Sequence, residues 1–217
     1  MADYNKKLSE LHQRVVQDKL RVPATIDESG WVQFKQPGLG DLTIHLREYN
    51  PEYMNIECSF EGHETQAHED LMRICNSLNH GGEIAQLSVS NTSSYVSASV
   101  RLLLASPGRM PDEALVREVI GIAMSSIKSV AAQLGEELPK LERARKSVND
   151  HLSLAYRPGM TADALFEAYR SSPAFAQDSR AAENMDFNLN LDFFHPYGYG
   201  KKRAAEMCAS VGNPGSA

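Results

Sequence analysis

The feature that most limits how this chain can fold is a strict alternation of apolar and polar side chains in two neighbouring stretches. Residues 42–47 read LTIHLR and residues 53–60 read YMNIECSF, so that every second side chain is apolar. A period of two gives a β-strand one apolar face and one polar face. Strands of this kind belong to a sheet that buries one face and exposes the other, which indicates antiparallel hairpins.

Three further stretches complete the expected sheet. Residues 31–35 precede the first alternating stretch across the turn QPGLGD, and residues 85–89 and 96–102 flank the turn SNTSS. Apolar side chains at helical spacing predict helices over 3–20, 66–79 and 111–138. The predicted order is α-β-β-β-α-β-β-α. The expected fold class is therefore α+β, a two-layer sandwich in which helices cover one face of a five-stranded antiparallel sheet.

The character of the sequence changes at Pro139, so we expect residues 1–138 to form one domain and residues 139–217 a C-terminal extension. The extension is expected to be mainly helical, because KLERARKSVNDHLSLAY suits a charged helix and Thr161 suits the N-cap of a second one. Its apolar residues are too sparse for an independent domain. We expect it to pack on the core or on another chain.

The segment DFNLNLDFF, residues 186–194, admits a metal-binding and a structural interpretation. Oxygen ligands at every second position resemble the opening of a calcium loop, but such a loop needs Gly at its sixth position and Glu at its twelfth. Here these positions are Leu191 and Tyr197. The favoured interpretation is an extended amphipathic arm that docks on its own sheet or on a sister subunit. Its apolar side chains are Phe187, Leu189, Leu191 and Phe193.

The charge balance argues against a nucleic-acid or membrane partner. The chain carries 22 Lys and Arg against 28 Asp and Glu, a formal net charge of −6, whereas nucleic-acid binders show a basic face. No apolar run approaches the length of a membrane span, and the charged N-terminus does not suit a signal peptide. Cys58, Cys75 and Cys208 lack metal-binding spacing, and we expect reduced, packed thiols in a cytoplasmic protein.

None of the stretches that could support chemistry meets the requirements of its motif. His63 and His68 are five residues apart and diverge by about 140° around a helix, whereas the HExxH zinc motif uses positions i and i+4. There is no GxSxG, and the turn PGLGD lacks the lysine of a phosphate loop. The sequence therefore predicts no catalytic residue, no metal site and no cofactor, and we expect a protein that is not an enzyme.

Small residues recur at every fourth position along the helix predicted to end near Leu138. They are Gly121, Ser125 and Ser129. A row of small side chains lets another helix approach closely. Two interpretations remain open. The helix that packs against these small residues is either the N-terminal helix of the same chain or a helix of a second subunit in a homodimer.

A recognisable arrangement runs over about residues 5–138. It consists of the strand triplet WVQF, LTIHLR and YMNIECSF, a mid-chain helix that ends near Asn76 and Asn79, the hairpin IAQLSVS and YVSASVRLLL, and a last helix that opens PDEALV. This arrangement resembles the YbjN-like proteins, a family described as bacterial sensory-transduction regulators, which are similar in fold to type III secretion chaperones. The resemblance implies a dimeric module that binds other polypeptides and has no catalytic residues.

Two functions from different classes follow. The preferred one is a non-catalytic protein-binding module, chaperone-like or regulatory, that holds a polypeptide partner on the sheet or helix surface or by backbone pairing at a strand edge. The alternative is a small-molecule sensor or enzyme whose pocket lies between the core and the extension. The side chains expected to line that pocket are Tyr156, Tyr169, Phe193, His195, Tyr197 and Tyr199.

Overall fold

The structure is a computed structural model of the 217-residue chain, and it describes residues 2–46, 52–60, 68–79, 84–90, 95–106, 109–183 and 195–211. The chain divides into two compact units, Met1–Leu134 and Gly135–Ala217. Both this boundary and the one expected at residue 138 fall within a single helix.

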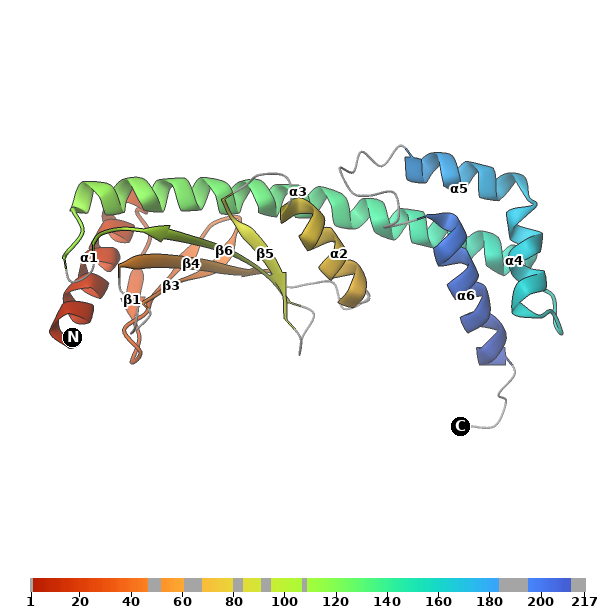
Figure 1. Cartoon of the computed structure of the whole chain (residues 1–217), viewed down its shortest axis with the longest axis horizontal. Coiled ribbons are helices and arrows are strands. Elements are labelled where there is room, and N and C mark those ends of the chain that lie inside the picture. The colour runs from red at the N-terminus through yellow and green to blue at the C-terminus, as the bar shows by residue number, and fades with distance from the viewer. Residues whose placement is uncertain are drawn as a thin grey trace. The chain divides into compact units, whose positions relative to one another are not determined.

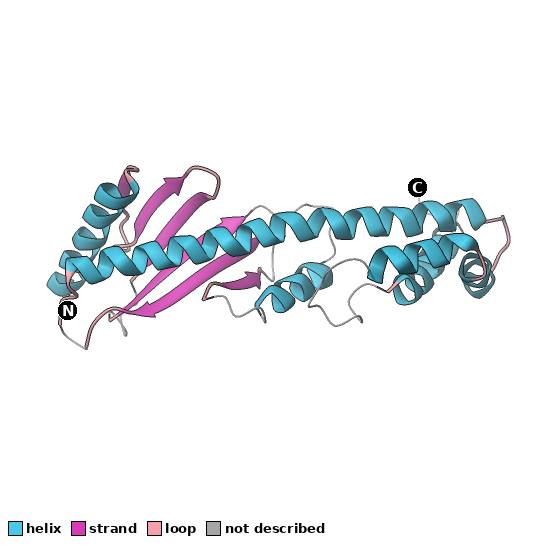
Figure 2. Ribbon diagram, turned by 90° about the horizontal axis from the view of Figure 1, so that it is seen from above, coloured by secondary structure: helices cyan, strands magenta, loops and turns pink. Residues whose placement is uncertain are grey.

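The first unit is an α+β sandwich built on one antiparallel sheet. Its elements are α1 (Ala2–Leu20), β1 (Ala24–Ile26), β2 (Val32–Gln36), β3 (Gly40–His45), β4 (Tyr53–Phe60), α2 (His68–Asn79), β5 (Gln86–Val89), β6 (Val96–Leu103) and the first part of α3 (Glu113–Ala155). The strand order is β1-β2-β3-β4-β6-β5. The first part of α3 runs across one face of the sheet (Figure 1 and Figure 2).

The alternating pattern produces this layering. Ile44 on β3, Ile56 on β4 and Val100 on β6 are fully buried, whereas the residues directly before and after each of them along its strand are exposed or half-buried. The covering helices contribute Leu8, Val15 and Val16 from α1 and Val116, Ile120, Ala123 and Ile127 from α3, all fully buried. The predicted α+β class and antiparallel sheet are therefore confirmed.

The sheet has six strands, so the prediction of five is wrong. The additional strand is β1, which pairs with β2 through Ala24↔Phe34 and Ile26↔Val32. It has three residues, too few for an alternating pattern to be visible. Its pairing with β2 and its contacts with α1 define it, and both are tertiary interactions.

The helix predicted to end near Leu138 continues through Pro139 to Ala155. An interior proline removes a backbone hydrogen bond and crowds the carbonyl four residues earlier, at a cost of about 3 kcal/mol. The helix buries apolar side chains on both sides of the proline, including Val130, Leu141 and Val148. Burial of these side chains offsets the cost, and a local helix-stop signal is overridden.

The second unit consists of helices. The end of α3 is followed by α4 (Ala162–Arg170), α5 (Pro173–Glu183) and α6 (Pro196–Val211). Thr161 caps α4 as predicted, since its side chain accepts a hydrogen bond from the backbone N–H of Ala164 at 3.2 Å. α6 packs on α4, where a Cβ on Gly200 would lie 3.0 Å from Cε1 of Tyr169. Within the described residues, no helix has the length and apolar character needed to cross a membrane.

Candidate binding groove

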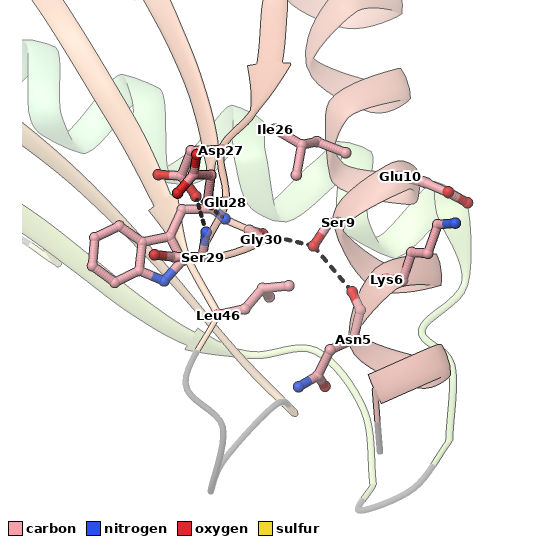
Figure 3. Close-up of a pocket in the computed structure, with 11 residues that line it drawn as sticks. Asn5, Lys6, Ser9, Glu10, Ile26, Asp27, Glu28, Ser29, Gly30 and Leu46 are labelled. Atoms are coloured by element: carbon pink, nitrogen blue, oxygen red, sulfur yellow. Dashed lines mark hydrogen bonds between the residues drawn. The ribbon is translucent and has the colours of Figure 1, made fainter.

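A groove of about 800 Å³ opens in the first unit between α1 and the β1–β2 hairpin (Figure 3). One wall is the face of α1 that carries Asn5, Lys6, Ser9 and Glu10. The opposite wall is the hairpin from Ile26 to Trp31, and Leu46, directly after β3, completes the lining. We call this feature the hairpin groove.

Asp27 fixes the shape of the hairpin wall. Its Oδ1 accepts hydrogen bonds from the backbone N–H groups of Ser29 and Trp31 at 2.9 and 3.0 Å. Its Oδ2 accepts a further bond from the side chain of Gln33 at 2.8 Å. Asp and Asn favour such turns because the short side chain reaches the backbone two residues on. The turn closes at Gly30, whose φ of 78° suits glycine.

Ser9 ties the two walls together. Its hydroxyl lies 2.7 Å from the carbonyl oxygen of Gly30 and 3.0 Å from that of Asn5, one turn earlier on α1 (Figure 3). Ser9 is 2% exposed, so water competes little for this donor. This hydrogen bond links the helix wall of the groove to the hairpin wall.

Trp31 is the main apolar side chain of the groove, together with Ile26 and Leu46. It is 36% exposed. Its ring contacts that of His45 edge-on, with 4.5 Å between the ring centres. Nε2 of His45 in turn lies 3.2 Å from a carboxylate oxygen of Glu57. An indole that is held on one side and open on the other is a typical anchor point of a binding surface.

The polar lining of the groove carries more negative than positive charge. Oδ1 of Asn5 is buried and has no hydrogen-bond partner among the described residues. An acceptor in this state costs free energy until a donor reaches it. The lining holds three carboxylates, Glu10, Asp27 and Glu28, and one ammonium, Lys6. The lining therefore favours a ligand that brings N–H donors.

The sheet face opposite α3 is polar. His45, Asn55 and Arg101 are neighbours across β3, β4 and β6, and the guanidinium of Arg101 lies 4.5 Å from the centre of the Tyr53 ring. Trp31 connects this face with the hairpin groove, because it lines the groove and contacts His45.

At both edges of the sheet, side chains form hydrogen bonds with backbone groups of the edge strand. Oδ1 of Asn79 accepts the N–H of Leu87 at 2.7 Å, and Nδ2 of Asn79 donates to the carbonyl of Leu87 at 2.8 Å. At the opposite edge, Gln13 and Gln17 donate to the carbonyl of Ala24 at 2.7 and 3.2 Å. These are backbone groups that an added strand would use. The structure thus favours the groove over strand-edge pairing as a docking place.

The residues predicted to form a small-residue row do not share one environment. Gly121 faces α1, since a Cβ there would collide with Nζ of Lys19, which donates to the carbonyl of Arg117. Ser125 is exposed, and Ser129 accepts a hydrogen bond from Gln133 at 3.3 Å. A homodimer seam at these positions stays a prediction. The predicted arm residues Phe187, Leu189, Leu191 and Phe193 lie outside the described residues.

The aromatic candidates of the alternative function lie among the helices of the second unit, apart from Phe193, which is outside the described residues. The Tyr197 ring packs edge-on against Phe166 at 5.0 Å, and the His195 ring lies 6.5 Å from that of Phe175. Tyr199 lies 5.3 Å from the guanidinium of Arg145, and Tyr156 directly follows α3.

Tyr169 belongs to a buried polar cluster that the sequence pattern did not reveal. Asp178 is 3% exposed and accepts hydrogen bonds from Tyr169 at 2.7 Å, His151 at 2.9 Å and Ser147 at 2.7 Å. Burial raises the pKa of Tyr169, and the Asp178 carboxylate raises it further. Because Ser147 bonds to the carboxylate itself, the set is not a serine–histidine–aspartate relay. It anchors α5 to α3 and α4.

The cysteines are buried or partly buried thiols. Cys58 and Cys75 are buried and free, and burial raises their pKa values to about 11 and 12. Neither thiol ionises near neutral pH, which argues against a nucleophilic role. Over the described part of the chain, no group of three or more His, Cys, Asp or Glu side chains could hold a metal ion.

From the sequence, Trp31 was predicted only to begin a strand. No role was predicted for Asn5, Ser9 or Asp27. The available signal was the turn sequence DESG directly before the single tryptophan of the chain. That α1 forms the second wall is a tertiary fact, because Ser9 and Gly30 are 21 residues apart.

No protein-family model matches the chain, and no curated protein matches it. The chain is similar to a chain in the solved structure of the HopA1-SchA chaperone-effector complex, with 15% identity, a TM-score of 0.39, and coverage of 58% of this chain and 93% of that one. It is also similar to a chain in the ExsC-ExsE complex, with 15% identity, a TM-score of 0.43, and coverage of 58% and 88%.

Proposed function

We propose that this chain is a non-catalytic polypeptide-binding module, chaperone-like or regulatory, which holds a segment of its partner in the hairpin groove. The observation that carries the proposal is the groove itself. It combines an open indole, two further apolar side chains and three carboxylates against one ammonium. A polypeptide suits this lining, since its side chains can fill apolar space and can carry the opposite charge.

The remaining parts of the proposal follow the sequence-based expectations. The protein is a bacterial, cytoplasmic homodimer related to the YbjN-like regulators, and it is not an enzyme. In favour of a non-catalytic role, Asp27, one of the two carboxylates of the hairpin turn, already accepts three hydrogen bonds. It is therefore poorly placed to take a proton from a substrate.

The proposal is tested by selecting binders from a random peptide library displayed on phage, with the full chain as bait. We expect selected peptides to lose at least about tenfold in affinity when Trp31→Ala removes the indole, because an anchoring aromatic contributes about 2 kcal/mol or more. Lys35→Ala, on an exposed strand position outside the groove lining, is the matched control. Peptides that bind both variants equally would place the binding surface elsewhere.

The small-molecule alternative is tested in parallel by thermal unfolding against a panel of metabolites and metal ions. A ligand specific for the folded state raises the unfolding temperature. A rise of several degrees with one compound, together with no peptide selected, would favour a sensor or enzyme over the module proposed above.

A further inference from the structure

The charges along the hairpin groove indicate which polypeptides it takes. Lys6 is the one basic group of the lining, whereas Glu10, Asp27 and Glu28 are acidic, so the lining carries one positive and three negative charges. Of the acidic groups, Asp27 is already held by three hydrogen bonds. Glu10 and Glu28 are exposed, and neither forms an ion pair with another described residue.

Glu10 and Glu28 lie on opposite walls. Glu10 belongs to α1 and Glu28 to the hairpin (Figure 3), and the apolar side chains Ile26, Trp31 and Leu46 complete the lining. A ligand in the groove therefore has the three carboxylates and the one ammonium of the lining as its charged neighbours. Opposite charges across such a site raise the association rate and select among partners.

We infer that the groove selects a polypeptide segment in which Lys or Arg residues alternate with large apolar residues. The apolar side chain covers Trp31, Ile26 and Leu46, and the flanking cations approach Glu10 and Glu28. This inference rests on the proposed function and names the chemical class of its partner.

Trp31 makes a direct test possible, because it is the single tryptophan of the chain and lines the groove. Three acetylated and amidated peptides of equal length are titrated against the full chain while the tryptophan emission is recorded. The peptides alternate Leu with Lys, Leu with Gln or Leu with Glu. We expect a saturable change in emission with affinities in the order Lys, Gln, Glu, and weaker binding of the Lys peptide as salt is added.

Matched variants locate the charge effect. The double substitution Glu10→Gln and Glu28→Gln should weaken the Lys peptide by about three- to tenfold and leave the Gln peptide unchanged. Glu118→Gln removes the same type of charge from an exposed position on α3 outside the groove lining and should change neither. Circular dichroism spectra that match the wild type establish that each variant is folded.

The possible results distinguish a failure of the proposed charge selection from a failure of the proposed peptide binding. If the Lys and Gln peptides bind equally, or if Glu118→Gln weakens the Lys peptide as much as the groove substitutions do, the charge selection is wrong and the peptide groove stands. If none of the three peptides changes the emission of Trp31, both the inference and the proposed groove are contradicted.

Discussion

At the scale of single residues, the protein accommodates two buried polar side chains in opposite ways. His12 on α1 is fully buried, and neither ring nitrogen has a partner among the described residues. Burial lowers its pKa to about 4, so the imidazole is neutral. Asp178 is 3% exposed and accepts three hydrogen bonds, as a buried carboxylate requires. Sequence periodicity cannot distinguish these cases, because it reports the side that a residue faces and not its partners.

His12 makes the stability of the first unit dependent on pH. The unfolded chain protonates this residue near its ordinary pKa of 6.5, whereas the folded chain does so near pH 4. The stability is therefore complete above pH 6.5 and is lost as the pH falls toward 4. Between pH 7.5 and pH 5 this loss amounts to about 2 kcal/mol. In urea unfolding, the free energy of unfolding of His12→Leu should fall between pH 7.5 and pH 5 by about 2 kcal/mol less than that of the wild type. An equal fall in both proteins would contradict this role of His12.

Asp178 should be the most sensitive polar residue of the second unit. Asp178→Asn removes the charge and places an amide against a hydroxyl, a phenol and an imidazole that now point donors toward it. We expect a loss of about 2–4 kcal/mol, measured by thermal unfolding followed by circular dichroism. Asp150→Asn is the control, since Asp150 forms an exposed i,i+4 pair with Lys146 and should change stability by less than about 1 kcal/mol. Comparable effects of the two substitutions would refute the cluster's role.

At the scale of elements, the long alternating strands and amphipathic helices follow from local pattern, whereas β1 and the length of α3 do not. β1 forms because it pairs with β2 and packs against α1. α3 continues through Pro139 because it buries apolar side chains both before and after the proline. The end of α2 shows a further effect of this kind. Asn79 hydrogen-bonds both backbone groups of Leu87 and so holds α2 against the edge of β5.

Asn79→Ala should leave the N–H and carbonyl of Leu87 without partners. We expect a loss of about 1–3 kcal/mol and exchange of the Leu87 amide hydrogen at least about tenfold faster than in the wild type. Met72→Ala, at a position on the same helix that is 42% exposed, controls for side-chain truncation. Unchanged exchange at Leu87 in the Asn79 variant would show that this side chain does not hold the edge.

At the scale of the whole molecule, the class of fold could be predicted from the sequence and the candidate site could not. Alternation in 42–47 and 53–60 predicts a sheet with one buried face, and the structure confirms it. The groove instead depends on α1 and the β1–β2 hairpin meeting through Ser9 and Gly30, and one strand of that hairpin was not predicted. The local pattern of apolar and polar residues does not predict a tertiary contact of this kind.

The predicted arm at 186–194 belongs to this scale too. A deletion of the C-terminus would also remove α6, which packs on α4, so substitution is the cleaner test. We expect replacing Phe187, Leu189, Leu191 and Phe193 by Ser to lower the unfolding temperature by at least about 5 °C, or to lower the oligomeric mass, because docked apolar area is lost. Asn188→Ser with Asn190→Ser is the control. No change relative to the control would disprove a docked arm.

The central claim is that a polypeptide segment occupies the groove between α1 and the β1–β2 hairpin, and hydrogen exchange tests it most directly. The full chain is compared with and without the peptide that alternates Leu and Lys, with exchange followed residue by residue. The account predicts that the peptide slows exchange in residues 5–10 and 27–31 and leaves the opposite sheet edge at Leu87 unchanged. Protection confined to other parts of the chain, with none in these two stretches, would contradict it.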